Sequence, residues 1–362
     1  MCSTRSKDEL QIVLGRENHD YRRNLDHWDD TVIWSPYKEH NPHLLISGGS
    51  GSGKTEALKV ICRELALNNV PILVFDYHND FSSFAVNIVN EKNIKIHPLE
   101  ILVGEKPKDV MYKVSSIFKH TFKDITTIQE GVIRNAIRQF YKECCIEDLT
   151  KPNDGSYRLL PFYRFRGFLN AATADKRTVA SLEIKLDILF DYELFSESDA
   201  TSLDFSTLLQ QNTVFQLKNA PSDDVKKVVT ELMISKLIQH CYLMEQTKKM
   251  RLYCIIDEAH RMAYSGSPIE TLFREARKYG IGVILASQRA TDFNENLLAN
   301  AGTIITLKQN LSKDAKYIAK NEWARPDTLM RLRPGEGYIK ASSELEAKMF
   351  QVVRHSDRSA QL

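Results

Sequence analysis

Eight consecutive residues at positions 48–55, Gly-Gly-Ser-Gly-Ser-Gly-Lys-Thr, have the composition and spacing of a phosphate-binding loop. They satisfy the pattern G-x-x-x-x-G-K-[ST], in which glycines let the backbone approach a polyphosphate and point N–H groups at it. Lys54 is expected to reach the β and γ phosphates, and the Thr55 hydroxyl to hold Mg²⁺. The residues expected to contact the nucleotide are Gly48, Gly49, Ser50, Gly51, Ser52, Gly53, Lys54, Thr55 and Glu56.

The residues on either side of the loop supply the elements that must position it. Leu44–Ile46 is a short apolar run typical of a buried strand, and Glu56–Leu67 has the pattern of a helix. The amino terminus of that helix adds a favourable field for an anion. A merely flexible glycine turn is the alternative, but strand, loop and helix occur in the required order. The sequence therefore predicts binding of a nucleoside triphosphate.

A second apolar strand, Leu252–Ile256, ends in the two carboxylates Asp257 and Glu258. Asp257 is placed to hold Mg²⁺ through water, and Glu258 to polarise the attacking water as a general base. The alternative is a strand that ends in a solvated acidic turn. Ligands collect at the carboxyl ends of strands in α/β sheets, so the phosphate-binding loop favours the functional interpretation. The extra glutamate favours an ATPase over a P-loop kinase.

Two further strands end in polar residues that could face the same site. Gly282–Ala286 leads to Gln288, which could bond the γ-phosphate or the attacking water, although a polar residue at an ordinary strand end is the alternative. Pro71–Phe75 leads to Asp76, which could support the metal ion or its water. His78 is interpreted as a loop residue and not as a ligand.

A helix with readable ends lies between the second and third of these strands. Ser267 is the expected N-cap with Glu270 as its capping-box partner, and Gly280 closes the helix. Arg274 and Arg277 lie three residues apart and therefore share a face. That face could be solvated and paired with acidic neighbours, or either arginine could cross a subunit boundary to the neighbour's γ-phosphate. An arginine supplied in trans can be worth about 10³–10⁵ in rate.

Five segments together resemble the HerA/FtsK branch of P-loop ATPases: HLLISGGSGSGKT, VFDYHND, LYCIIDEAH, REARKYGIGVILASQRATDF and LLANAGTIITL. The resemblance covers roughly residues 30–355. It implies that Lys54 and Thr55 bind nucleotide and Mg²⁺, that Asp257 and Glu258 form the acidic pair, and that Gln288 is the sensor glutamine. Arg274 or Arg277 matches the trans arginine of the family, whose members are hexameric DNA-pumping motors related to ATPases of conjugation and type IV secretion.

The expected fold is an α/β, RecA-like (ASCE) P-loop domain with a mainly parallel central sheet and a helical insertion. We expect an amino-terminal arm at 1–40 and the ATPase domain at 41–362, with the insertion at about 106–197. Ile128–Tyr141 and Val179–Leu194 are the clearest helical stretches of that insertion. Typical HerA proteins carry a small β-barrel before the P-loop, where this chain has only about forty residues. This short form also looks similar to ATPase modules of bacterial anti-phage systems, including phosphorothioation-linked restriction.

Composition sets weaker limits. The 362 residues include 49 basic and 47 acidic side chains, a net charge of +2, whereas a dedicated nucleic-acid binder is usually strongly basic. A ring motor needs positive charge only where it meets DNA. Lys308–Lys340 is locally richer, with eight basic residues (Lys308, Lys313, Lys316, Lys320, Arg325, Arg331, Arg333 and Lys340) against four acidic ones (Asp314, Glu322, Asp327 and Glu336). It could be a solvated helix face or a DNA contact, and Arg331 and Arg333 could alternatively reach a neighbour's nucleotide.

No apolar run is long enough to span a bilayer, and the amino terminus has no cleavable signal, so we expect a cytoplasmic protein with no membrane contact. Six cysteines without a C-x-x-C pair agree with a reducing compartment. The function expected is an ATP-driven hexameric ring that uses ATP and Mg²⁺ to translocate or remodel double-stranded DNA. The alternatives are a nucleotide-dependent ring scaffold that regulates a partner, such as an effector nuclease or another defence protein, and a type IV secretion-like ATPase.

Overall fold

The computed structural model describes residues 10–17, 30–90, 96–191, 195, 205–320 and 324–353. The chain forms two compact units, and each draws on separate parts of the sequence. The first comprises residues 1–88, 209–215 and 246–362, and the second comprises 89–208 and 216–245. These units divide the chain differently from the arm, core and insertion expected from the sequence.

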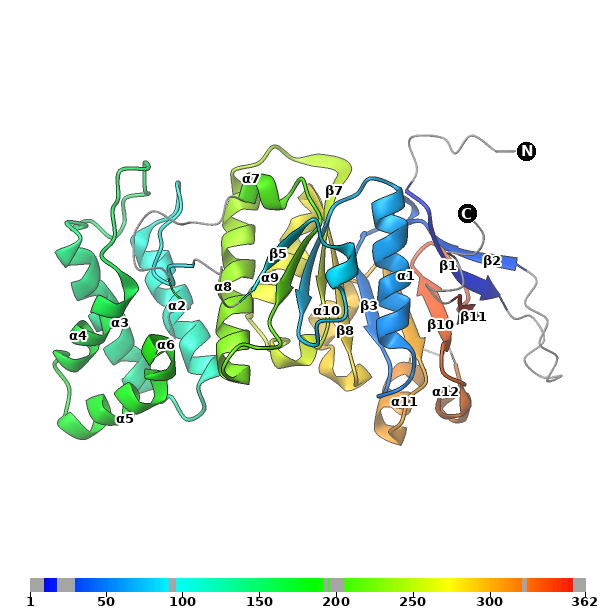
Figure 1. Cartoon of the computed structure of the whole chain (residues 1–362). Helices are drawn as coiled ribbons and strands as arrows, with labels where there is room; N and C mark the ends of the chain where they lie inside the picture. Colours follow the sequence, from blue (N-terminus) through cyan, green and yellow to red (C-terminus); the bar gives the residue numbers. More distant parts are fainter. Residues whose placement is uncertain are drawn as a thin grey trace. The chain divides into compact units, whose positions relative to one another are not determined.

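The first unit is built on an 11-stranded sheet with the order β2-β1-β11-β10-β9-β3-β8-β7-β4-β6-β5 (Figure 1). Five adjacent strands, β9, β3, β8, β7 and β4, run parallel to one another. From β9 outward the pairing becomes antiparallel through β10, β11, β1 and β2. The strands are β1 (Ile12–Glu17), β2 (Asp30–Trp34), β3 (Leu44–Ser47), β4 (Ile72–Asp76), β5 (Asn87–Val89), β6 (Thr213–Gln216), β7 (Thr247–Ile256), β8 (Tyr279–Ser287), β9 (Thr303–Leu307), β10 (Glu336–Ala341) and β11 (Lys348–Val352).

Sequence pattern explains which strands are central. Every residue of β3, β4 and β9 is buried, as expected of continuous apolar runs in a parallel sheet covered on both faces. In the edge strand β2 exposure alternates, with Val32 and Trp34 buried and Ile33 45% exposed. The described part of the amino-terminal stretch is therefore two strands of the sheet. The α/β, RecA-like fold with a parallel central sheet is confirmed.

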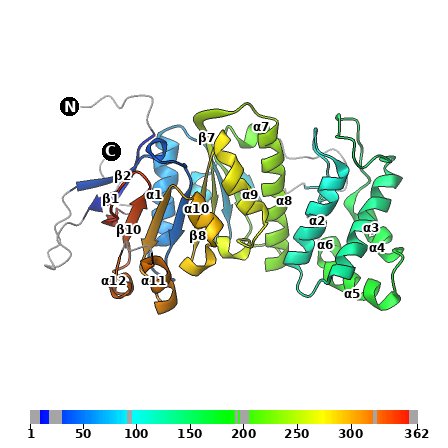
Figure 2. The ribbon, with the colours of Figure 1, turned by 180° about the vertical axis from the view of Figure 1, so that it is seen from behind.

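Helices cover both faces of this sheet. Figures 1 and 2 show α1 on one face and α9 and α10 on the other. The helices of the first unit are α1 (Lys54–Leu67), α9 (Pro268–Glu275), α10 (Glu295–Asn300), α11 (Ser312–Ala319) and α12 (Pro326–Arg331).

The second unit is helical where it is described. Its helices are α2 (Pro107–Thr121), α3 (Thr127–Glu143), α4 (Phe165–Asn170), α5 (Lys176–Leu186), α6 (Ile188–Asp191), α7 (Phe205–Leu208) and α8 (Asp223–Tyr242). The first expected stretch is α3, which begins with a capping box between Thr126 and Gln129. The second is interrupted at Asp187 and forms α5 and α6, and its last residues, 192–194, lie outside the described residues. The second unit has an aromatic core, in which the ring centroid of Phe162 lies 5.3–5.8 Å from those of Phe165, Phe190 and Phe195.

Across the described ranges, no helix combines the length and the apolar character needed to cross a membrane.

Gly302, just before β9, is hydrogen-bonded to the segment that precedes β3. This contact helps to set the position of β3, the central strand of the sheet. Its N–H donates to the carbonyl of His43 at 3.0 Å. A Cβ at this position would lie 1.7 Å from the backbone oxygen of Asn41, which is itself buried.

We predict that Gly302→Ala lowers the free energy of unfolding by about 1–3 kcal/mol, the usual cost of overpacking, because backbone cannot move aside cheaply. Gly167→Ala is the matched control, since Gly167 lies in α4 and a Cβ there meets nothing within 4 Å. Urea-unfolding midpoints of both variants measure the difference. Equal midpoints would show that the sheet tolerates the added methyl group.

Candidate nucleotide-binding site

The phosphate-binding loop lies between the carboxyl end of β3 and the first turn of α1. Two neighbouring strand ends hold its start, since the Gly48 N–H donates to the Ser287 carbonyl at 3.1 Å and the Gly49 N–H to the Lys308 carbonyl at 2.8 Å. Gly53 is in the left-handed region, with φ 94°, and α1 begins directly after it with no side-chain cap. The first-turn N–H groups of a helix have no intrahelical partner, so here they are donors for an anion.

Three strand ends bring the expected catalytic side chains together. The ammonium of Lys54 lies 3.6 Å from Asp257 Oδ1 and 3.8 Å from Glu258 Oε1. The Gln288 amide donates to Glu258 Oε1 at 3.0 Å. The carboxyl ends of β7 and β8 and the loop after β3 therefore meet at one edge of the sheet, as parallel strands require.

Glu258 is the most heavily contacted residue of this group. Its backbone is left-handed (φ 65°, ψ 39°), a conformation that costs a non-glycine residue about 1–2 kcal/mol. Its N–H donates to Asp257 Oδ1 at 3.1 Å. His260 Nδ1 lies 3.3 Å from its Oε2 and His78 Nε2 lies 4.0 Å from its Oε1.

Sequence reasoning did not single out His260, and it treated His78 as an ordinary loop residue. His78 does lie in a loop, but its ring is beside the site. The signal that could have found both is position, because each histidine follows within a few residues of a strand that ends at this edge.

Asp257 has an environment that favours a nearby cation. Burial raises the pKa of its carboxyl group above the usual value, the Lys54 ammonium opposes that rise, and the Glu258 carboxylate adds to it. A positive charge beside a buried carboxylate favours its ionised form. The donor set of Asp257 and the Thr55 hydroxyl is one that Mg²⁺ uses with a bound phosphate.

The contacts of Asp76, which we expected could support a metal ion, give its carboxylate a structural role. Its Oδ1 accepts the N–H groups of His78 and Asp80, both at 3.1 Å, and its Oδ2 accepts that of Phe81 at 2.9 Å. Asp76 is only 1% exposed. Its carboxylate therefore folds the loop after β4, which holds His78 beside Glu258.

Residues from the far end of the chain also hold the phosphate-binding loop. The Asn310 amide donates to the Ser50 carbonyl at 3.3 Å, and the Gly335 N–H donates to the Ser52 carbonyl at 2.8 Å. A Cβ at Gly53 would lie 2.9 Å from the Gly335 nitrogen. Sequence reasoning missed Asn310 and Gly335 because nothing in the local pattern says that they return to the loop.

The two arginines of the expected trans pair do not lie at the site of their own chain. They occupy α9 and the turn that follows it, before the amino end of β8, whereas Gln288 follows its carboxyl end. β8 has nine residues, so its length separates the two positions by roughly 30 Å.

Their contacts distinguish the two arginines. Arg274 bonds Glu275 at 3.2 Å. Arg277 is exposed, and its guanidinium makes no hydrogen bond or ion pair with another residue that the structure describes. Its charge helps to lower the pKa of buried His43 to about 3, although desolvation is the larger cause.

The ends of α9 differ from expectation in two details. Ser267 caps the helix by accepting the Glu270 N–H at 3.2 Å, as expected. The Glu270 carboxylate accepts the N–H of Gly266 at 2.6 Å, however, and not that of Ser267. The α-helix ends at Glu275, and a 3-10 turn carries the chain to β8. Gly280 lies inside β8, so the expectation that it closes the helix is wrong.

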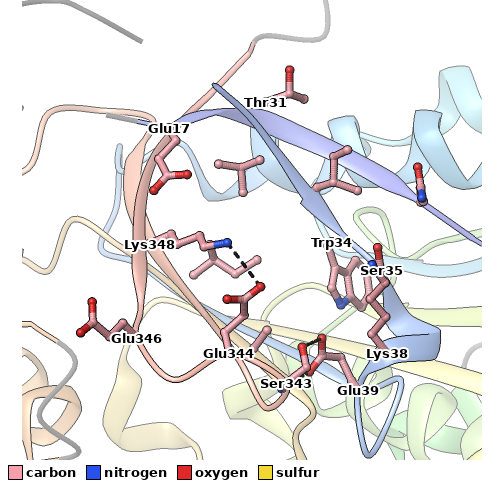
Figure 3. A pocket seen from close by; sticks show the side chains of 15 residues that line it. Glu17, Thr31, Trp34, Ser35, Lys38, Glu39, Ser343, Glu344, Glu346 and Lys348 are labelled. Carbon is pink, nitrogen blue, oxygen red and sulfur yellow. Dashed lines mark hydrogen bonds and ion pairs between the residues drawn. The ribbon is translucent and has the colours of Figure 1, made fainter. Parts of the chain in front are cut away.

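A separate hollow of about 180 Å³ lies over β1, β2, β10 and β11 (Figure 3). Several of its charged side chains are already paired, including Glu344 with Lys348 at 3.3 Å and Glu39 with the Ser343 hydroxyl at 2.7 Å. None of the phosphate-binding loop lines it. This hollow is therefore not the nucleotide site.

The fold and the site define the class of RecA-like P-loop proteins. Residues 38–237 match the family described as "Helicase HerA, central domain", and the chain belongs to that family. The DNA double-strand break repair helicase HerA of Sulfurisphaera tokodaii is 24% identical over 293 residues, which are 76% of this chain and 57% of that protein. The DNA import protein CedB of Sulfolobus acidocaldarius is 26% identical over 299 residues, which are 78% of this chain and 45% of that protein. The chain thus spans about half the length of these relatives.

Solved structures show the same fold at low identity. VirB4 of Thermoanaerobacter pseudethanolicus superposes with a TM-score of 0.73 at 17% identity, covering 96% of this chain and 97% of the other. The plasmid coupling protein TrwB in complex with ADP and Mg²⁺ gives a TM-score of 0.65 at 14% identity, covering 88% of this chain and 86% of the other.

We predict opposite effects for the two buried aspartates. Asp76→Asn leaves an amide facing backbone N–H donors, so it should lower the free energy of unfolding by about 1–3 kcal/mol and leave the Mg²⁺ dependence of nucleotide binding unchanged. Asp257→Asn should weaken that Mg²⁺ dependence and cost little stability. Thermal unfolding and nucleotide titrations with and without Mg²⁺ measure both effects. A Mg²⁺ requirement that disappears in Asp76→Asn would return Asp76 to the metal site.

Proposed function

We propose that this chain is an ATP-driven motor that assembles into a ring, hexameric as in the family it belongs to, hydrolyses ATP between subunits and translocates or remodels duplex DNA. The observation that carries the proposal is the Glu258 carboxylate, held within 3.8 Å of the Lys54 ammonium and 3.0 Å of the Gln288 amide. Relatives named as a DNA repair helicase and a DNA import protein support DNA as the substrate.

The residues present fit a nucleoside triphosphate with Mg²⁺. The uncapped start of α1 supplies N–H donors, and the Ser52 hydroxyl is buried without a hydrogen-bond partner in the described part of the chain. Mg²⁺, when bound, would neutralise charge on the β and γ phosphates. Thr55 and Asp257 would hold it, and Lys54 would reach the same phosphates.

Glu258 is the general base of the proposed reaction. It would accept a proton from the attacking water while the water oxygen bonds to the γ-phosphorus and the bond to the β–γ bridging oxygen breaks. Gln288 would bond the water or the γ-phosphate and report which nucleotide is present. His260 and His78, which lie beside the same carboxylate, would help to set its direction.

Arg277 is the better candidate for the trans arginine. It lies before the amino end of β8, whereas the nucleotide loop of its own chain lies at the carboxyl ends of the strands. Its side chain is exposed, and its guanidinium forms no ion pair with a described residue. Arg274 is held by Glu275, which also accepts Lys278 at 2.7 Å. An exposed pair of this kind contributes little to stability, but it does occupy the guanidinium.

We predict that Glu258→Gln keeps ATP bound and stops hydrolysis, because the amide cannot accept the proton. Lys54→Ala should lose nucleotide binding or turnover, since it removes the charge that faces the phosphates. Steady-state phosphate release and ATP binding measure both effects, with the unfolding midpoint as a check on folding. Undiminished turnover in Glu258→Gln would remove this residue from the mechanism.

We predict that Arg277→Ala lowers turnover by about 10³–10⁵-fold, as expected for an arginine supplied in trans, while Arg274→Ala keeps most of the activity. Mixing Arg277→Ala subunits with Glu258→Gln subunits should restore activity, because some interfaces then contain Glu258 of one subunit and Arg277 of the next. Phosphate release as a function of the mixing ratio measures this rescue. A mixture that stays inactive at every ratio would exclude action in trans.

DNA-stimulated turnover separates a DNA motor from the other ring functions. Turnover that needs a protein partner and ignores linear duplex DNA would favour a scaffold for an effector, or an ATPase that moves protein. Particle size recorded in the same samples tests the ring.

A further inference from the structure

Residues 309–335 form a small helical lobe inserted between β9 and β10. It contains α11 and α12, and we call it the α11–α12 lobe; residues 321–323 within it lie outside the described part. The two helices pack on a small hydrophobic core that is separate from the main core of the sheet. This small core consists of Ala290, Ala315, Ile318, Leu329, Leu332 and Met349.

The lobe concentrates the positive charge of the basic run. Two residues of that run, Lys308 and Lys340, lie outside the lobe. The Lys308 carbonyl accepts the Gly49 N–H of the phosphate-binding loop, and the Lys340 ammonium donates to the Leu345 carbonyl at 2.9 Å within the β10–β11 hairpin. Five basic side chains of the lobe are exposed and make no ion pair with another described residue: Lys313, Lys316, Lys320, Arg325 and Arg331.

Acidic side chains do not balance this charge. Asp314 is buried and accepts the Thr291 N–H at 3.1 Å, and Glu336, just past the lobe, is buried and accepts the Arg333 N–H at 2.7 Å. Asp327 is the one exposed acid among the described residues of the lobe, and Glu295 on α10 is exposed close to Tyr317. The whole chain carries only +2, so this local excess is where a polyanion would be attracted.

The chemistry of the surface favours a duplex over an unpaired strand. Proteins that bind single strands stack bases on exposed aromatic rings. In the described part of the lobe the aromatic side chain is Tyr317, which is partly buried and donates its hydroxyl to the Phe293 carbonyl at 2.8 Å. In the residues of the lobe that the structure describes, exposed charge is therefore not accompanied by an exposed stacking ring, which suits the phosphate backbone of duplex DNA.

Both ends of the lobe are attached to the nucleotide loop. At its start, Asn310 donates to the Ser50 carbonyl at 3.3 Å, close after the Lys308 carbonyl that accepts the Gly49 N–H. At its end, the Gly335 N–H donates to the Ser52 carbonyl at 2.8 Å. These two hydrogen bonds join the lobe directly to the backbone that would cradle the phosphates.

We infer that the exposed basic face of the α11–α12 lobe binds the phosphates of duplex DNA and couples that binding to ATP turnover through Asn310 and Gly335. This inference rests on the proposed function and names the surface through which DNA would act. It does not require the lobe to read base sequence.

The test compares two triple variants of the full chain that make the same chemical change. The lobe variant is Lys313→Gln, Lys316→Gln and Lys320→Gln. The control is Lys108→Gln, Lys248→Gln and Lys249→Gln, three exposed lysines elsewhere that also make no ion pair with a described residue. Fluorescence anisotropy with a labelled duplex of about 30 base pairs, long enough to cover several turns of DNA, gives the affinity at several salt concentrations. Phosphate release gives turnover with and without DNA.

The lobe variant should bind DNA more weakly, with the slope of log affinity against log salt reduced by about 0.9 for each DNA phosphate that the protein no longer neutralises. Its DNA-free turnover should equal that of the wild type, and its stimulation by DNA should disappear. The control should keep the wild-type slope and stimulation. If the lobe variant matches the control, or binds single strands or RNA more weakly but not the duplex, the inference is wrong while the motor function stands. Wild-type protein that neither binds DNA nor is stimulated by it would instead refute the proposed function.

Asn310→Ala tests the coupling separately from the binding. It removes the hydrogen bond to Ser50 but none of the five exposed charges. Duplex affinity and salt slope should stay at wild-type values, while DNA stimulation should fall about five-fold, the effect of one ordinary hydrogen bond on an equilibrium. Stimulation that persists at the wild-type level would exclude Asn310 as a link.

Discussion

The parallel pairing of β9, β3, β8, β7 and β4 is the constraint on which the rest of the structure depends. It places the carboxyl ends of five strands at one edge, so polar residues that follow those strands must meet there or remain unpaired in the interior. Such pairing needs apolar cover on both faces, which α1 and α9 help to supply (Figure 2). The phosphate-binding loop has its position because its own strand, β3, lies between β9 and β8. The ends of β8 and β9 on its two sides accept the first N–H groups of the loop.

The electrostatics of the site follow from that burial. Two carboxylates and an ammonium, all less than 10% exposed, share a small volume at the ends of β7 and β3. Each charge would be costly alone. The Lys54 ammonium offsets the cost of burying Asp257 only in part, and the Glu258 carboxylate adds to it, so the pKa of Asp257 stays raised. The left-handed backbone of Glu258 adds strain at the same point. Strain and buried charge at a strand end are characteristic of functional sites, where they are kept for binding and catalysis.

Local pattern predicted the regular elements where one strong signal covered the whole element. The strand at Leu44, the helix after the phosphate-binding loop and α3 were all expected close to their observed bounds, because apolar periodicity and end signals agree there. Local pattern described the amino-terminal arm least well. The sequences of β1 and β2 do not by themselves show that they belong to the sheet; they join it because β1 pairs with β11 and β2 pairs with β1. The second helical stretch of the insertion splits at Asp187, a break that periodicity alone does not mark.

The sequence by itself determined the nucleotide loop, the acidic pair at Asp257 and the polar strand end at Gln288, because each is a short contiguous pattern with its own strand. Only the tertiary structure decided that Asp76 serves its own loop, that two histidines flank Glu258, and that Asn310 and Gly335 hold the loop from the far end of the chain. It also separated Arg277 from Arg274, two residues that look alike in sequence, by giving one of them an acidic partner. The contacts of His78, Asn310 and Gly335 join residues that are far apart in the sequence. Those of Asp76 and Arg274 are local, but they depend on how the backbone folds around each side chain. Both kinds of contact are settled by packing and hydrogen-bond satisfaction, not by local pattern.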